Sequence, residues 1–153
     1  MTGSDRARTV EPPPRVPGLA GLDRYDYAEA FAFGAAATRT PEEWSRRILL
    51  GASVRDRLTM LAAWTVLTVH LSPPWTPQIL GWRILHSSPD ALVLGVRATI
   101  GLTARIVIVP DEAGTVVHAM LVRFDRPLGR RVWQRMAPGH RKFLGRIISQ
   151  AAR

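Results

Sequence analysis

The sequence predicts an α+β fold in which a curved antiparallel sheet is closed by a long C-terminal helix. Three observations predict it: two helix-start signals in residues 40–56, four β-rich runs separated by short turns in residues 79–124, and an amphipathic pattern after residue 127. Short connections between successive strands favour antiparallel neighbours. The apolar face of such a sheet must be covered, and the last helix carries a stripe that can cover it.

Length and composition are those of one globular domain. The chain has 153 residues, of which 46% are hydrophobic, and chains of roughly 100–200 residues usually form one domain. Cysteine is absent, which excludes disulfides and a cysteine nucleophile and leads us to expect a cytoplasmic location. The most apolar segment, residues 58–71, is too short to cross a bilayer. We therefore expect no integral membrane segment.

Residues 1–24 are expected to form a flexible, proline-rich arm. Their prolines, at positions 12–14 and 17, lie among polar and small residues without hydrophobic periodicity, which is typical of an extended segment. The apolar core of a secretory signal peptide is missing from this stretch. We place a single domain at residues 25–153.

Two short helices are predicted before the main run of strands. Thr40 followed by Pro41, with Glu43 three positions after the threonine, is a strong helix start. Ser53 is expected to cap the second helix. Apolar residues between positions 58 and 69 occur almost all the way round that second helix, which predicts burial on several sides.

About five strands are predicted. Aromatic residues alternating with alanine indicate the first strand, and apolar runs bounded by turn residues indicate the others. The predicted strands cover residues 26–33, 79–86, 91–98, 102–109 and 115–124. In the two middle strands of this set, the larger apolar residues share one face, which we expect to lie against the last helix. Arg97 and Arg105 lie on the other face.

The last helix combines an apolar stripe with a basic face. Pro138 and Gly139 lie within the stripe, so we expect a kink or a brief break there. The basic residues are Arg126, Arg130, Arg131, Arg135, Arg141, Lys142, Arg146 and Arg153, and no acidic residue follows Asp125. Such a face either contacts phosphate or anionic lipid or is simply solvated, as is common near a helix C-terminus.

The order of elements is similar to that of the helix-grip fold of the START and polyketide-cyclase-like (SRPBCC) superfamily. The likeness covers residues 25–152. It is sharpest at Trp133-Gln134-Arg135-Met136-Ala137-Pro138-Gly139-His140, a W-x4-P-x-H run that resembles the end of a bacterial domain family of unassigned function. Full members usually have more strands than the five predicted here. The resemblance implies a cavity for an apolar molecule between sheet and helix, and it implies no particular reaction.

Eight residues are candidates for the wall of such a cavity. His140 lies seven residues after Trp133 and seven before Ile147, which places it on the inward face of the helix. The candidate ligand-binding residues are Trp44, Trp64, Trp82, His118, Met120, Trp133, Met136 and His140. Each has a structural alternative: tryptophans at such spacing are often core, and a histidine beside Pro138 can satisfy carbonyls that a helix break sets free.

We expect the chain to bind a small hydrophobic molecule rather than to catalyse a reaction. No catalytic constellation, metal-ligand spacing or nucleotide-binding motif occurs, so neither a metal nor a cofactor is expected. One alternative is a cyclase- or aromatase-like enzyme that uses His140 as acid or base. Another is a basic module that contacts nucleic acid or an anionic membrane surface through the last helix. The sequence carries no signal for an oligomeric state.

Overall fold

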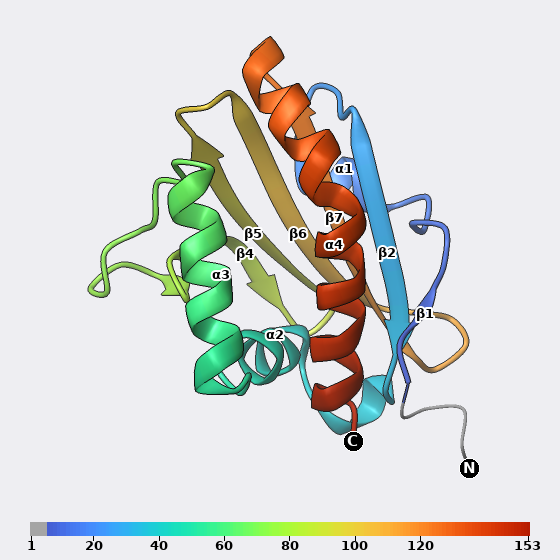
Figure 1. The fold of residues 1–153 in the computed structure, drawn as a ribbon. Helices are drawn as coiled ribbons and strands as arrows, with labels where there is room; N and C mark the ends of the chain where they lie inside the picture. The colour runs from blue at the N-terminus through green and yellow to red at the C-terminus, as the bar shows by residue number, and fades with distance from the viewer. Residues whose placement is uncertain (1–5) are drawn as a thin grey trace.

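The computed structural model describes residues 6–153 as an open seven-stranded antiparallel sheet with helices on both faces (Figure 1). The strand order is β1-β2-β7-β6-β5-β4-β3. The strands are β1 (Arg8–Thr9), β2 (Tyr27–Phe33), β3 (Gln78–Ile79), β4 (Trp82–Ser88), β5 (Ala91–Ala98), β6 (Leu102–Pro110) and β7 (Val116–Phe124). The predicted fold class is confirmed, and the layout is compatible with a helix grip.

Four α-helices accompany the sheet in this part of the chain. They are α1 (Val16–Ala20), α2 (Pro41–Leu49), α3 (Val54–Val66) and α4 (Pro127–Ala151), with a 3-10 turn at Ala36–Thr38. The long helix α4 runs in front of the sheet beside β2, and α3 lies on the same side (Figure 1). The short helix α1 packs on the opposite face. Among residues 6–153, no helix is both long enough and apolar enough to cross a bilayer.

The five predicted strands are present, and two more complete the sheet. Strands β1 and β3 have two residues each, and they pair with β2 and β4 at opposite edges of the sheet. A two-residue strand has no periodicity of its own, and only its neighbour in space makes it a strand. The sheet therefore has seven strands, two more than the sequence pattern predicted.

The predicted extended arm is wrong for residues 8–20. Strand β1 pairs with the edge of the sheet, and Val16 and Ala20 of α1 are buried against it, at 0% and 2% exposure. They contact alanines and valines on the convex face, where small side chains let a short helix approach closely. Residues 1–5 of the predicted arm lie outside the described residues.

The predicted helix starts are confirmed by their caps. The Thr40 hydroxyl accepts a hydrogen bond from the backbone N–H of Glu43 at 3.2 Å. The Ser53 hydroxyl accepts one from the backbone N–H of Asp56 at 3.1 Å. Each cap satisfies an N–H that the first turn of a helix leaves free.

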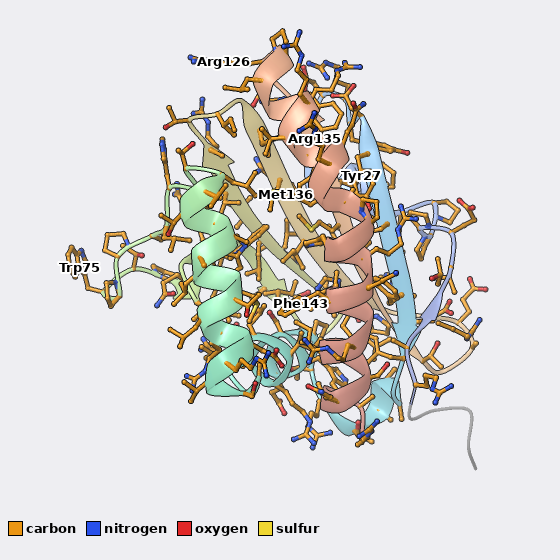
Figure 2. All side chains as sticks on the ribbon, viewed as in Figure 1. Tyr27, Trp75, Arg126, Arg135, Met136 and Phe143 are labelled. Carbon is orange, nitrogen blue, oxygen red and sulfur yellow. The ribbon has the colours of Figure 1, made fainter. Side chains whose placement is uncertain are left out.

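The predicted burial of α3 on several sides is wrong. Asp56 and Met60 are its buried residues, whereas Val54, Leu58 and Val66 are 64%, 61% and 66% exposed. Only one narrow face of α3 therefore packs on the protein. The loop that follows the helix carries Trp75, which is 85% exposed and projects away from the molecule (Figure 2).

The sheet presents its larger apolar residues to α4, as predicted. Leu92 and Leu94 of β5 and Ile108 of β6 are fully buried on this concave face. Arg97 and Arg105 lie on the other face, where Arg97 is exposed and Arg105 is half-buried. The α4 residues that complete the core are Trp133, Ala137, Leu144, Ile147, Ile148 and Ala151.

Helix α4 runs through Pro138 without the predicted break. Proline removes one intrahelical hydrogen bond and leaves the carbonyl four residues earlier without its usual donor. Here both Pro138 and Gln134 are exposed, so water can satisfy that carbonyl and the helix can continue. As a result, one rigid element carries both Trp133 and His140 along the sheet.

The burial of α1 can be tested with matched valine substitutions. Val16→Ala removes methyl groups from a closed core and should destabilise the protein by about 2 kcal/mol, as is typical of large-to-small core changes. The control is Val54→Ala, because Val54 is likewise the first residue of a helix but is 64% exposed. Urea unfolding of both variants measures the difference. Equal stability of the two would contradict the packing of α1 described above.

Candidate functional site

An apolar cavity of about 420 Å³ lies between α3, α4 and the concave face of the sheet. Helix α3 contributes Met60, Ala63 and Trp64, and the sheet contributes Trp82 and Ile106, among others. Helix α4 contributes a row of residues that includes Met136, Gly139, His140 and Phe143. Figure 2 shows the side chains of Met136 and Phe143 on the side of α4 that faces α3. The cavity is the part of the concave face that α4 does not fill.

Six of the eight candidate residues come together in the wall of this cavity. They are Trp64, Trp82, His118, Met120, Met136 and His140. Trp133 lines a smaller space of about 50 Å³, whose wall includes five of the same six residues. The structure places Trp44 elsewhere: it is 2% exposed, and its ring packs edge-on against Phe33 at 5.2 Å. Trp44 is a core residue at the start of α2.

His118 is a buried histidine whose ring lines the cavity. It is directly opposite Phe31 in the β2–β7 pair, which fixes its side chain on the concave face. The residue is 2% exposed, and its Nδ1 atom has no hydrogen-bond partner within residues 6–153. Burial lowers the pKa of His118 to about 4, although the nearby carboxylate of Glu29 acts in the opposite direction. The imidazole is therefore neutral at pH 7.

Glu29 is a functional candidate that the sequence reasoning missed. Glu29 is on β2, opposite Met120 of β7, so its side chain shares the concave face with His118. The residue is 4% exposed. Its Oε1 atom is 2.7 Å from Nδ1 of His140, a close contact without well-directed hydrogen-bond geometry. Its Oε2 atom accepts a hydrogen bond from the Tyr27 hydroxyl at 2.8 Å. A charged residue at an inward position of an apolar strand was the available signal.

The contacts around Glu29 keep its carboxylate ionised. Burial alone would raise the pKa of Glu29, but the interactions with His140 and Tyr27 outweigh it and hold that pKa below its usual value. Burial and the hydrogen bond to Glu29 raise the pKa of Tyr27 to about 12. Nε of Arg141 adds a cation 3.6 Å from Oε2 of Glu29. A buried charge needs such partners, because an isolated one is costly.

His140 reaches across from α4 to β2. Its Nδ1 atom faces Glu29, its ring lies 5.0 Å from that of Trp133, and its side chain is 25% exposed. The partner is a carboxylate of the sheet, whereas the structural interpretation of the sequence expected helix carbonyls beside Pro138. Since His140 also lines the cavity, the Glu29–His140 pair places an acid–base group at the cavity wall.

One ion pair within residues 6–153 joins α3 to α4. Both terminal nitrogens of Arg146 donate to the carboxylate of Asp56, each at 2.9 Å, and this bidentate arrangement is geometrically specific. The hydrogen bonds from Arg146 hold the pKa of Asp56 below its usual value. Arg135 lines the cavity and is exposed, which places a positive charge at its mouth.

The basic face of α4 is partly occupied by contacts within the protein. Arg146 binds Asp56, Arg141 contacts Tyr27 and Glu29, and Arg130 lies 5.2 Å above the ring of Phe124. Other basic residues of this helix, such as Arg131 and Lys142, are exposed and form no ion pair with residues 6–153. The predicted contact with an anionic surface stays a prediction.

Two searches bear on the identity of the site. No group of three or more His, Cys, Asp or Glu side chains in the described part of the chain is arranged to hold a metal ion. Comparison of the chain with protein-family models, curated proteins and solved structures found no match. The cavity and the residues in its wall are therefore the features of the protein that bear on its function.

The neutral state of His118 predicts a pH dependence of stability. The pKa of His118 is about 4 in the folded protein and about 6.5 when unfolded, so the unfolded chain binds more protons between these values. Stability should therefore fall as the pH decreases through this window, by about 2 kcal/mol between pH 7 and pH 5. His118→Leu should lose most of this dependence in urea unfolding. His86→Leu, at an exposed histidine of β4, should keep it, and equal behaviour of the two variants would contradict the assignment.

Proposed function

We propose that this protein binds a small hydrophobic molecule in the cavity between the sheet, α3 and α4. The observation that carries the proposal is the cavity itself: about 420 Å³, lined mainly by apolar side chains, with a few polar groups from His118, His140, Thr59 and Arg135. Ligand sites in proteins usually have volumes of about 300–1,000 Å³ and this same composition. Methionine in the wall also favours adaptable packing around an apolar ligand.

The driving force in this proposal is the removal of apolar surface from water. Each 100 Å² of apolar ligand surface that the cavity buries contributes roughly 2.5 kcal/mol. Polar groups in the wall contribute orientation, since a hydrogen bond made inside the cavity has a small net value but a strict geometry. In this proposal the aromatic and aliphatic residues of the wall supply the affinity, and the histidines supply the orientation of the ligand.

Two finer assignments accompany this proposal. We propose kinship with the START and polyketide-cyclase-like superfamily, supported by the antiparallel sheet, the long helix α4 and the Trp133–His140 motif on it. We also propose a cytoplasmic location, which suits a chain without cysteine. Neither assignment specifies a ligand, because this architecture serves many functions.

Native mass spectrometry of freshly purified protein tests the proposal directly. We expect a bound apolar molecule, or uptake of one when the protein is incubated with fatty acids, sterols and aromatic polyketides. Protein that is empty and takes up none of these compounds would overturn the proposed function.

A matched pair of substitutions on α3 locates the binding site. Ala63→Trp places an indole where Ala63 lines the cavity, so we expect at least a tenfold loss of affinity for any apolar ligand found in the first experiment. Ala62→Trp introduces the same side chain one position away, at an exposed alanine, and should leave affinity unchanged. Both carry the same helix-propensity cost. Equal affinity of the two variants would show that binding occurs outside the cavity.

The Glu29–His140 contact favours acid–base catalysis in the cavity as a second candidate function. A histidine fixed by a carboxylate can remove and return a proton of a bound ketone, with a rate gain of typically about 10²–10⁴-fold. In D2O the protein should accelerate deuterium exchange at the methyl group of 2-acetylnaphthalene, followed by NMR. His140→Gln should abolish the acceleration without unfolding the protein. Exchange no faster than in buffer would exclude this candidate.

A further inference from the structure

We propose that the cavity selects an amphiphile whose buried end carries an uncharged hydrogen-bonding group, such as a hydroxyl, phenol or carbonyl, bound by the ring of His118. This inference rests on the proposed function and specifies the class of ligand. It follows from three features: an imidazole in the sheet wall whose Nδ1 atom has no partner among residues 6–153, a buried carboxylate close to it, and an exposed cation in the cavity wall.

The Nδ1 atom of His118 is a polar atom without a hydrogen-bond partner among residues 6–153, in a mostly apolar wall. Its neighbours in that wall include Ile106 and Met120, which offer no hydrogen bond. The residue is 2% exposed, and its Nδ1 atom is buried without a partner among residues 6–153. Buried polar groups are nearly always paired, so an unpaired one beside a cavity of ligand size indicates a partner supplied by the ligand.

The partner of His118 is expected to be uncharged. A neutral imidazole has one donor and one acceptor nitrogen, so it matches a hydroxyl, which does both, or a carbonyl, which accepts. A carboxylate at this depth would lose its water shell and lie near the ionised Glu29, which is close enough to act on the pKa of His118. Both effects disfavour an anion at the inner end.

A charged end of the ligand can lie at the mouth instead. Of the cavity-lining residues in the described part of the chain, Arg135 alone carries a permanent charge, and it is exposed on α4. His118 lies on β7 and Arg135 on α4, and Figure 2 shows α4, with Arg135 labelled, in front of the sheet. In this proposal the ligand therefore binds in one orientation, with its uncharged polar end at His118, its apolar body in the cavity and its outer end in solvent near Arg135.

Three naphthalene probes of similar shape test this order. 2-Naphthol carries a hydroxyl, 2-methylnaphthalene replaces it with a methyl group, and 2-naphthoate carries an anion. Equilibrium dialysis at neutral pH should show 2-naphthol bound about five- to tenfold tighter than 2-methylnaphthalene, the value of one net hydrogen bond. The affinity for 2-naphthoate should fall in Arg135→Gln and should not change in His118→Leu.

Substitutions in the wall identify the group that makes the hydrogen bond. His118→Leu should remove the preference for 2-naphthol while leaving 2-methylnaphthalene bound, and His118→Gln should restore part of it. Met120→Leu, on the same strand and in the same wall, should keep the preference. In the wild-type protein, 2-naphthol should shift the ring nitrogen resonances of His118, whereas 2-methylnaphthalene should not.

The outcomes separate this inference from the proposed function. If the wild-type protein binds none of the probes or the lipids tested earlier, the proposed function fails and the inference fails with it. If the probes bind without a preference for the hydroxyl, or if the preference survives in His118→Leu, the inference alone is overturned. It is also overturned if 2-naphthoate loses affinity in His118→Leu and not in Arg135→Gln. Thermal unfolding of each variant confirms that the fold is retained.

Discussion

The structure depends on covering the apolar concave face of its sheet. Strands β5, β6 and β7 present fully buried aliphatic residues to this face, and water contact with them would remove the main driving force for folding. Helix α4 covers the face beside β2, where Trp133, Leu144 and Ile148 pack. Helix α3 lies on the same side of the sheet as α4 (Figure 1), and the cavity lies between these two helices and the concave face.

Two polar residues of the concave face, Glu29 and His118, differ in the partners that surround them. Glu29 has a cation, a histidine and a phenol around its carboxylate, and these contacts tie β2 to α4. His118, which also lies on the concave face, has no such partner within residues 6–153. The first arrangement is what a structural ion pair requires. The second leaves the buried Nδ1 atom of His118 unpaired, and an unpaired buried polar group costs free energy.

The sequence predicted the architecture better than the site. A helix cap such as Thr40 acts within a single turn, and the alternation of apolar and small residues acts within a single strand. Local sequence patterns were therefore sufficient to predict the helices and the longer strands. The contacts Glu29–His140 and Asp56–Arg146 join residues about a hundred positions apart, and no local pattern carries them. The exposure of α3 was missed for a related reason: an apolar helix is buried only where the fold supplies partners, and here it supplies them on one side.

The outer side of α3 has a consequence for how this protein can change over evolution. Val54, Leu58 and Val66 support no core, and the inner side of the helix meets the cavity. Most residues of the larger apolar core come from the sheet, α2 and α4, whereas α3 contributes Met60. Substitutions at these exposed positions of α3 therefore carry little risk to folding.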